Sequence, residues 1–201
     1  MTTHEQFKEH HYIIKRNLLG QELAKNLEYQ FKMLRDIAMF RTDNDKDQFY
    51  DTLVTANCFS WFGVVDHLLV FLKPKIEELT GYELTPTYTF GRIYYKDAIM
   101  KQHVDRPACE ISATINISID GKPWPIWIKN NDGIDIPVEL FPGDALLYKG
   151  EILPHWRNPY VEGNEQVQFF LHWVDSNGPN VGEKFDGREM LGLPGIPRGT
   201  H

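Results

Sequence analysis

The sequence predicts an α+β protein that is mainly β, with helices first and an antiparallel sandwich or barrel after them. Two observations predict this fold class. Up to about residue 84, apolar residues recur every three or four positions, as they do along one face of a helix. After that point, short segments alternate apolar and polar residues between turn signals, as strands do. We therefore expect a single domain over 1–201, in which a mostly helical region, 1–84, supports a sheet core over 85–175.

Two amphipathic helices are expected in the N-terminal region. The first follows the apolar residues of Leu19–Ala38, and the second covers about Trp61–Thr80. Pro74 should kink the second helix or begin a new one, because proline lacks the N–H group that a helix interior uses. The polar segment 42–47 between the two helices is expected to be a loop.

Turn signals divide the second region into strands. The dipeptide Asp120-Gly121 is typical of a hairpin and would pair the strand before it with the strand after it. After Asp175, many Gly and Pro residues predict an irregular or disordered tail over 176–201. The segments with strand composition are 85–95, 110–119, 124–128, 136–140, 145–148 and 166–174.

The composition narrows the classes of function. A net charge of −7 argues against broad electrostatic binding of DNA or RNA, which needs a basic surface. No segment reaches the roughly 20 apolar residues of a membrane helix, and the first residues lack the pattern of a signal peptide. Cys58 and Cys109 form neither a disulfide framework nor a zinc-ligand pattern. We expect a cytoplasmic protein without nucleic-acid or membrane partners, and its oligomeric state stays open.

The residues His103, Asp105 and His155 suggest a metal centre. His103 and Asp105 are two positions apart, so an extended backbone would direct both side chains to one face. His155 lies much further along the chain, which leaves room for several strands to fold it back beside the first pair. Two imidazoles and one carboxylate can hold one face of an octahedral iron(II) and leave three positions open. Because a His-x-Asp pair alone is a weak signal, its surroundings decide its meaning.

The surroundings resemble the iron(II)/2-oxoglutarate-dependent dioxygenases, and most of all their prolyl 4-hydroxylase-like branch. The resemblance covers roughly residues 85–175. Four features in the family's order carry it: the tyrosine strand Arg92–Tyr95, the pair His103–Asp105, the strand Ala113–Ile117, and Pro142–Tyr148 leading into His155. The resemblance implies a double-stranded β-helix, that is, a jelly-roll or cupin-like barrel, with the N-terminal helices as support.

The same resemblance implies an enzyme that binds Fe(2+) through His103, Asp105 and His155 and uses 2-oxoglutarate and O2. Such an enzyme converts 2-oxoglutarate to succinate and CO2 while it hydroxylates an unactivated C–H bond of a peptide, a protein residue or a small molecule. Tyr94 occupies the position of the family's 2-oxoglutarate-binding tyrosine, and Asn116 is a candidate contact of the co-substrate. Core packing for Tyr94 and strand pairing for Asn116 are equally open readings.

The chain departs from the family at the start of its last strand, where an Arg or Lys usually pairs with the distal carboxylate of 2-oxoglutarate. Residues 163–168 contain no basic side chain. Gln168 would share the inward face with His172 and can hydrogen-bond a carboxylate, but it cannot neutralise the charge. His172 itself is either a neighbour of the metal centre or an ordinary buried polar group.

A different cation is therefore needed, and Arg157 is the preferred candidate. It lies two residues beyond His155, so an extended strand places both on one face, and a guanidinium can grip a carboxylate with two parallel bonds. Arg92 and Arg106 are weaker candidates, and Arg106 could instead meet the substrate.

Several rival interpretations remain at this stage. Arg157 could form an ion pair with Glu151 or Glu162 instead of binding a co-substrate. The protein could be an iron oxygenase that does not use 2-oxoglutarate, or a cupin-like module that binds metal without turnover. A structural zinc site fits less well, because such sites usually close with four ligands and favour cysteine.

Overall fold

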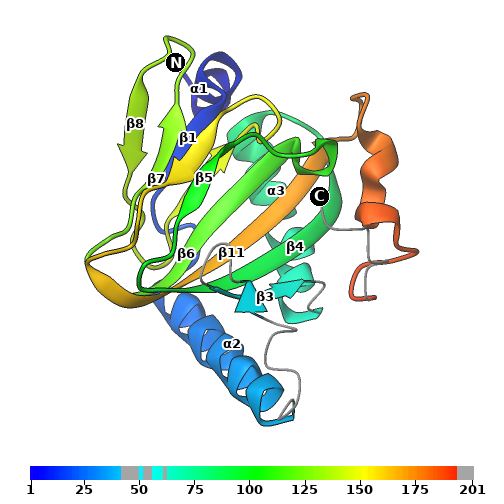
Figure 1. Cartoon of the computed structure of the whole chain (residues 1–201). Helices are drawn as coiled ribbons and strands as arrows, with labels where there is room; N and C mark the ends of the chain where they lie inside the picture. The colour runs from blue at the N-terminus through cyan, green and yellow to red at the C-terminus, as the bar shows by residue number, and fades with distance from the viewer. Residues whose placement is uncertain (42–49, 52–55, 61–62, 194–201) are drawn as a thin grey trace.

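The structure is a computed structural model that describes residues 1–41, 50–51, 56–60 and 63–193 as two antiparallel sheets and three α-helices (Figure 1). The helices are α1 (Thr3–His10), α2 (Gln21–Arg41) and α3 (Gly63–Thr80), with short 3-10 helices η1 (Pro107–Cys109) and η2 (Val181–Gly187). The strands are β1 (Tyr12–Lys15), β2 (Tyr50–Asp51), β3 (Ala56–Ser60), β4 (Leu84–Tyr95), β5 (Met100–His103), β6 (Ile111–Gly121), β7 (Ile126–Lys129), β8 (Asp135–Val138), β9 (Ala145–Tyr148), β10 (His155–Arg157) and β11 (Gly163–Asp175).

The strands form a large and a small sheet. The large sheet has the order β1-β9-β6-β11-β4-β3-β2, and the small sheet has the order β5-β10-β7-β8. Neighbouring strands are antiparallel in both sheets. The protein is therefore mainly antiparallel β with a few helices, which confirms the fold class expected from the change of hydrophobic period.

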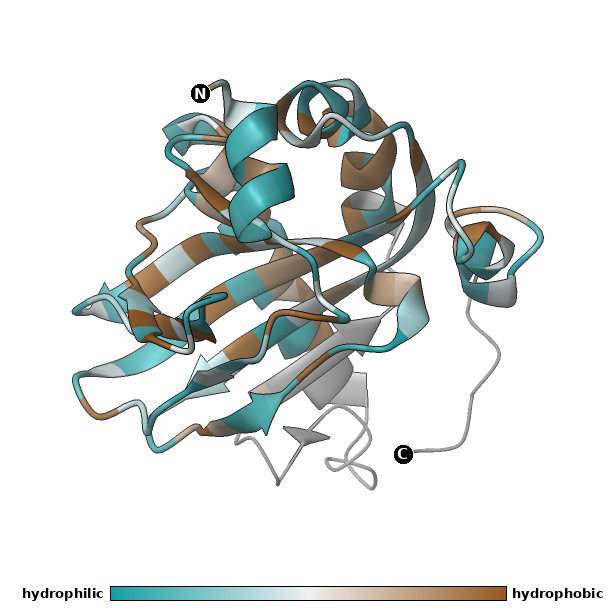
Figure 2. Cartoon of the chain, turned by 90° about the horizontal axis from the view of Figure 1, so that it is seen from above, coloured by the Kyte–Doolittle hydropathy of each residue, from teal (hydrophilic) through white to brown (hydrophobic). Residues whose placement is uncertain are grey.

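The two faces of the large sheet differ in chemistry, because side chains alternate along each strand. Along β11, Phe169, Leu171 and Trp173 join the main hydrophobic core together with apolar residues of α2 and α3. The alternate residues Gln168 and His172 point to the opposite face. Figure 1 shows α3 behind the large sheet, and Figure 2 shows the alternation as brown and teal bands along the strands. The helices thus cover one face and leave the other to the small sheet.

The small sheet packs against the inner face of the large sheet. Ile126 and Ile128 of β7 share a second apolar cluster with Leu146 and Tyr148 of β9. Beyond this cluster, polar and aromatic side chains of both sheets line the space between them. The fold therefore positions a polar interior between two sheets, away from the helices.

The prediction of a hairpin at Asp120-Gly121 is wrong. β6 pairs with β9 and β11 in the large sheet, whereas β7 pairs with β8 and β10 in the small sheet. Pro123 and Pro125 lie in the connection and lack the N–H groups that a tight two-stranded pairing would use. The chain therefore crosses from one sheet to the other here instead of turning back on itself.

The two long helices lie where the sequence predicts them, and of the two effects expected at Pro74, a kink or a new helix, no new helix begins there. α3 runs through Pro74 as one helix, with Leu69, Leu72 and Ile76 buried on its sheet-facing side. Burial of these side chains outweighs the cost of about 3 kcal/mol that an interior proline imposes. The loop expected over 42–47 lies outside the described residues. The short strands β1 and β3, which extend the large sheet, have no counterpart among the predicted elements.

The described part of the tail, residues 176–193, consists of turns and η2, and η2 packs against β4 and β11. Arg188 in this segment forms a buried ion pair with Asp66 of α3, with Nη1 and Oδ2 2.8 Å apart. None of the described helices combines the length and the apolar content that crossing a membrane requires.

Candidate active site

Two adjacent strands of the small sheet bring the expected metal ligands together. β5 and β10 are antiparallel, and His103 and His155 are direct partners in the register, with ring centres 4.3 Å apart. Asp105 lies just beyond the end of β5, where its N–H group donates to the carbonyl of Gly150 at 2.9 Å. Residues far apart in the sequence thus meet because one strand pairing aligns the histidines and one backbone bond turns Asp105 toward them.

The three side chains present a metal-binding geometry. The nearer carboxylate oxygen of Asp105 lies 3.6 Å from Nε2 of His103 and 3.6 Å from Nε2 of His155, and the three ligand atoms lie within 4.8 Å of one another. Each histidine Nδ1 lies 2.9 Å from the backbone carbonyl two residues earlier, at Lys101 and Leu153. A carbonyl only accepts, so both Nδ1 atoms carry the proton and both Nε2 atoms present a lone pair.

Gly150 makes room for the carboxylate. A Cβ atom at this position would lie 2.5 Å from Oδ2 of Asp105 and would also collide with the carbonyl oxygen of Cys109. The second oxygen of Asp105, Oδ2, is buried and has no hydrogen-bond partner within the described residues. A buried carboxylate oxygen without a partner is costly, and a bound cation would satisfy it.

The surroundings of the triad shift the pKa values of Asp105 and His155 toward the deprotonated form and shift that of His103 the other way. Burial alone would raise the pKa of Asp105, but the hydrogen bond with His103 and the potential of His155 together hold it below its ordinary value. Burial lowers the pKa of His155, so this ring is neutral near pH 7. The hydrogen bond with Asp105 raises the pKa of His103, so a proton competes with a metal ion at that ring.

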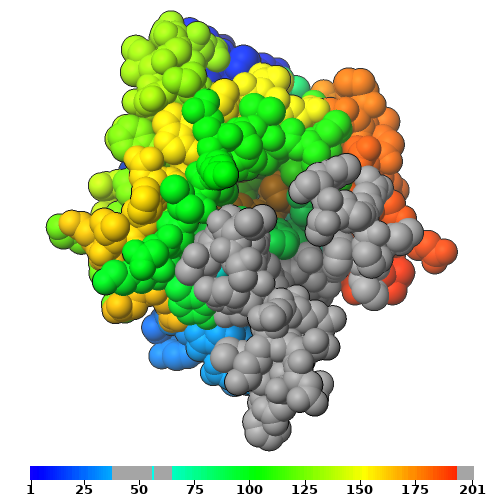
Figure 3. Space-filling view, in the orientation of Figure 1, coloured from blue at the N-terminus to red at the C-terminus, as the bar shows by residue number. Residues whose placement is uncertain are grey.

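A cavity of about 350 Å³ opens beside the triad, between the two sheets. Figure 3 shows this side of the molecule hollowed between the green segments, with the orange of β11 visible inside the hollow. Besides the triad, its lining comprises Tyr88, Phe90, Arg92, Met100, Arg106, Ile126, Tyr148, Phe170, His172 and Asp186.

His172 contributes a hydrogen-bond acceptor to this cavity. Its Nδ1 lies 2.8 Å from Oγ of Ser112, and that hydroxyl donates its only proton to the carbonyl of Cys109 at 3.0 Å. Nδ1 of His172 must therefore donate to Ser112, which leaves a lone pair on Nε2. Burial lowers the pKa of His172 to about 4, so the ring stays neutral, stacked on Tyr88 at 4.5 Å.

Arg157 is completely buried between the sheets, two residues beyond His155 on β10. Its Nη1 donates to the carbonyl of Trp124, and its guanidinium carbon lies 4.7 Å from the centre of the Trp124 ring. Nε and Nη2 have no hydrogen-bond partner within the described residues, and no carboxylate there lies within ion-pair distance of Arg157. Burial lowers its pKa to about 10. The rival ion pair is wrong: Glu162 pairs with Lys122, and Glu151 accepts from Asn180.

The three other residues expected at the co-substrate are also buried on the inner face of the large sheet, next to the cavity but not in its lining. Tyr94 of β4 packs edge-on against Trp124 and accepts a hydrogen bond from Arg92 at 3.2 Å. Gln168 of β11 and Asn116 of β6 are direct cross-strand partners. Nε2 of Gln168 and Oδ1 of Asn116 have no partner in the described part of the chain. Their roles at a co-substrate stay predictions.

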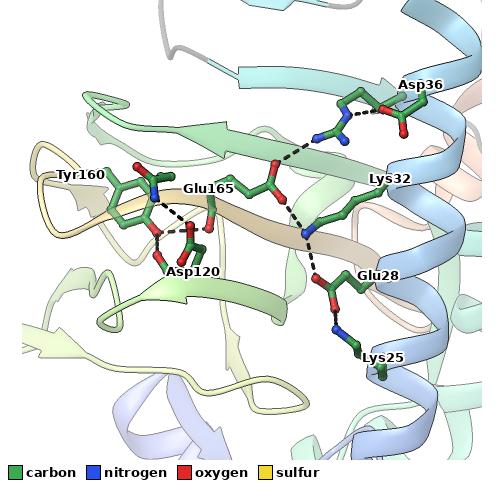
Figure 4. Close-up of polar contacts among 9 residues, drawn as sticks. Lys25, Glu28, Lys32, Asp36, Asp120, Tyr160 and Glu165 are labelled. Carbon is green, nitrogen blue, oxygen red and sulfur yellow. Dashed lines mark hydrogen bonds and ion pairs between the residues drawn. The ribbon is translucent and has the colours of Figure 1, made fainter.

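The alternation of β11 decides which of its first side chains face the interior. Glu165 points to the helix side, where it pairs with Lys32 at 2.5 Å and Arg35 at 2.9 Å on α2 (Figure 4). The neighbouring position on the inner face is Gln166, whose Oε1 is buried without a partner among the described residues. Arg157, on β10 of the small sheet, places a buried cation in this interior.

Two features of the site have no local signal in the sequence. Asp186 comes from the Gly-rich tail, yet it lines the cavity and pairs with Arg106 at 2.8 Å. Gly150 is one of many glycines, and only the approach of the Asp105 carboxylate marks it out. Both depend on contacts between distant segments, which periodicity and spacing do not encode.

This two-sheet fold is that of the 2-oxoglutarate/Fe(II) oxygenases. A prolyl-4-hydroxylase from Pseudomonas putida matches with a TM-score of 0.67 and 16% sequence identity, over 86% of this chain and 97% of that chain. The α-ketoglutarate-dependent epimerase SnoN from nogalamycin biosynthesis matches with a TM-score of 0.69 and 10% identity, over 99% and 92% of the two chains. HygX from Streptomyces hygroscopicus, solved with nickel, 2-oxoglutarate and hygromycin B, matches with a TM-score of 0.65 and 11% identity, over 86% of each chain.

No protein-family model matches the sequence, and a comparison with curated proteins found no match. The structural matches confirm, at the level of the fold, the resemblance that the sequence motifs indicate. They include a hydroxylase and an epimerase, so the fold alone does not determine the reaction.

Proposed function

We propose that this protein is an Fe(II)/2-oxoglutarate-dependent dioxygenase that hydroxylates a C–H bond of a small molecule or a peptide or protein residue. In this proposal the two sheets are the two halves of a double-stranded β-helix barrel, and residues 1–201 form a single domain. The buried, unpaired guanidinium of Arg157 is the observation that carries the use of 2-oxoglutarate.

The triad suits iron(II). Asp105 offers an ionised carboxylate, His155 offers a neutral Nε2 atom, and His103 offers its Nε2 atom once a metal ion displaces the competing proton, which together make the donor set of non-haem iron oxygenases. No fourth His, Cys, Asp or Glu joins the group within the described residues, so the open positions needed by a co-substrate are preserved. A closed structural zinc site would require that fourth ligand.

The interior behind the triad suits the distal carboxylate of 2-oxoglutarate. Burying a cation without a counter-charge costs several kcal/mol, and Arg157 has neither a carboxylate partner nor hydrogen bonds for two of its nitrogens. A carboxylate is the group that satisfies a guanidinium edge through two parallel hydrogen bonds. Nε2 of Gln168 is a further unsatisfied donor in this interior. The residues present therefore fit an anionic co-substrate.

Each residue has a distinct role in this proposal. Bound iron supplies the oxidation by dioxygen, which no side chain can perform. His103, Asp105 and His155 hold the ion, and the backbone carbonyls at Lys101 and Leu153 keep both imidazoles in the metal-binding tautomer.

The co-substrate contacts come from the inner faces of both sheets. Arg157 and Gln168 orient the carboxylate, with Tyr94 and Asn116 as neighbours. Phe90 and Phe170 exclude water from the cavity wall.

The test requires no substrate. Metal-free protein is mixed with iron(II) in the absence of oxygen, and 2-oxoglutarate is titrated in while the visible spectrum is recorded. We expect a weak charge-transfer band that saturates with 2-oxoglutarate and is absent in His155→Ala. Iron binding without such a band would refute the 2-oxoglutarate assignment. It would favour an oxygenase with another co-substrate or a metal-binding module without turnover.

A further inference from the structure

We infer that Arg106 binds an oxyanion of the substrate, a carboxylate or a phosphate, and that Asp186 positions the guanidinium for this contact. The inference rests on the proposed function, because it concerns the molecule that enters the cavity beside the metal centre. Arg106 directly follows the expected ligand Asp105 in the sequence and lies in the cavity wall. An anionic group held there lies in the same cavity as the metal ligands.

Arg106 has more hydrogen-bond donors than the protein uses. Its Nη1 donates to Oδ1 of Asp186 at 2.8 Å, and its guanidinium carbon lies 4.5 Å from the centre of the Tyr88 ring. Its side chain makes no other hydrogen bond within the described part of the chain, and 37% of it is exposed. A guanidinium has five donors in a plane, and a carboxylate or phosphate takes two of them at once. The remaining donors are thus available to a molecule in the cavity.

Asp186 acts on Arg106 and not directly on an incoming molecule. Only 6% of its side chain is exposed, against 37% for Arg106, so the guanidinium is the accessible member of the pair. Phe185, Asp186 and Gly187 have φ angles of 53°, 56° and 76°, a left-handed run that costs about 1 kcal/mol or more for each non-glycine residue. This left-handed turn directs the Asp186 carboxylate toward Arg106. The strained backbone persists only because neighbouring contacts hold the segment.

A buried clamp supplies those contacts. The side chains of Arg188 and Asp66 are 1% and 2% exposed, and their ion pair measures 2.8 Å. Arg188 also donates to the carbonyls of Thr87 at 3.0 Å and Phe185 at 2.8 Å, so it joins the strained turn to β4 and α3. The wall that carries Asp186 is therefore a fixed part of the site.

Arg106 and Arg157, the arginine proposed to bind the co-substrate, differ in their exposure to solvent. Arg157 is completely buried between the sheets, whereas Arg106 lies where the cavity is accessible from solvent. The nearby wall adds aromatic rings, Tyr88 and Phe170, and the acceptor Nε2 of His172. These groups fit a substrate with an oxyanion and an apolar or aromatic part.

The experiment uses the full chain loaded with nickel(II), which is redox-inert here, and saturated with 2-oxoglutarate. Benzoate, phenyl phosphate and benzamide, the neutral analogue of benzoate, are titrated in and their binding is followed by calorimetry. We expect at least one of the two anions to bind about 10-fold to 100-fold more tightly than benzamide. Arg106→Gln should abolish this preference, and Arg106→Lys should retain part of it. Comparison of benzoate with phenyl phosphate distinguishes a carboxylate site from a phosphate site.

Asp186→Asn separates positioning from simple charge. This variant makes the cavity more positive, so unspecific attraction would strengthen anion binding, whereas loss of positioning should weaken it. Equal binding of benzamide and the anions to the wild type, or an anion preference that survives Arg106→Gln, would overturn the inference. Unchanged affinity for 2-oxoglutarate in each variant confirms an intact site. If nickel-loaded wild type fails to bind 2-oxoglutarate at all, the proposed function fails, while the anion preference at Arg106 is still measured on the nickel protein.

Discussion

The two faces of the large sheet differ in what their side chains do. The face toward the helices is apolar, and Phe169 packs there edge-on against Phe31 of α2 with ring centres 4.9 Å apart. The face toward the small sheet has buried polar groups, among them Gln168 and His172, and the small sheet adds Arg157. Three of the atoms on this inner side that lack partners are hydrogen-bond donors: Nε and Nη2 of Arg157 and Nε2 of Gln168.

This difference separates stability from function within one sheet. Burial of apolar area stabilises the fold at the outer face, at about 25 cal/mol for each Å² removed from water. The inner face does the opposite, because buried polar groups without partners cost free energy. Proteins retain such groups where a ligand satisfies them, so the cost itself indicates a binding site.

The largest expected effect comes from a matched pair on β11. Phe169→Ala removes an outer-face ring and should lower the free energy of unfolding by about 3–5 kcal/mol, with the affinity of the remaining folded protein for 2-oxoglutarate unchanged. Phe170→Ala, one residue along on the inner face, should cost clearly less, because Phe170 already borders the cavity. Urea unfolding of both variants measures the two values. Equal costs would mean that the two faces do not differ as described.

Arg157→Met should raise the free energy of unfolding, whereas the two phenylalanine substitutions lower it. It replaces a buried cation without a partner by an apolar chain of similar length, so the ligand-free protein should become more stable by about 1–2 kcal/mol. The lost hydrogen bond to the carbonyl of Trp124 sets the upper limit. Thermal unfolding without metal or 2-oxoglutarate measures the change. A less stable variant would show that Arg157 has a structural role.

Alanine substitutions at two glycines, one beside the hydrophobic core and one beside the metal ligands, should separate the effect of packing from the effect of metal binding. A Cβ atom at Gly91 would lie 2.8 Å from Cε2 of Phe31, so Gly91→Ala should cost about 1–3 kcal/mol of stability through overpacking. Gly150→Ala should push the Asp105 carboxylate aside and weaken metal affinity by about 10-fold to 100-fold. Metal titration and urea unfolding of both variants check this. Unaltered metal affinity in Gly150→Ala would contradict the placement of Asp105.

The smallest expected effect concerns the ion pairs that join α2 to β11. Glu28 contacts Lys25 and Lys32 at 2.7 and 2.8 Å, and Lys32 also contacts Glu165 (Figure 4). Burial would raise the pKa of Glu28, but the two lysines hold it below its ordinary value. A lowered pKa stabilises the fold above the unfolded value of about 4.3, and this contribution disappears as the pH falls through the folded value.

Glu28→Gln should therefore lose less than about 1 kcal/mol at pH 7, and the difference from wild type should shrink below pH 4. Unfolding curves at both pH values, with Glu22→Gln as the control on the same helix, measure it. A difference that grows on acidification would have the wrong sign for this network.

The sequence predicts the parts of the molecule that depend on local pattern. Strand periodicity places His103 and His155 at strand ends, and the face shared by His155 and Arg157 on β10 follows from their spacing of two. Pairing partners are not local, which is why Asp120-Gly121 indicates a hairpin although β6 and β7 belong to different sheets.

The remaining features of the site depend on tertiary contacts. The sequence shows that residues 163–168 contain no cation. Only the structure shows that Glu165 faces α2 and that Arg157 lies in the interior without an ion pair to any described carboxylate. Asp186 lines the cavity because Arg188 and Asp66, far apart in the chain, fix a strained turn. No motif or period in the sequence encodes such a contact.

The most direct test of the account is a titration of 2-oxoglutarate into nickel-loaded protein, followed by calorimetry. Wild type, Arg157→Met and Arg92→Gln are compared, because Arg92 is the other inner-face arginine beside Tyr94. The account predicts at least about 30-fold weaker binding in Arg157→Met and near-wild-type binding in Arg92→Gln. Loss of binding in Arg92→Gln with full affinity in Arg157→Met would contradict the claim that the buried guanidinium of Arg157 holds the co-substrate.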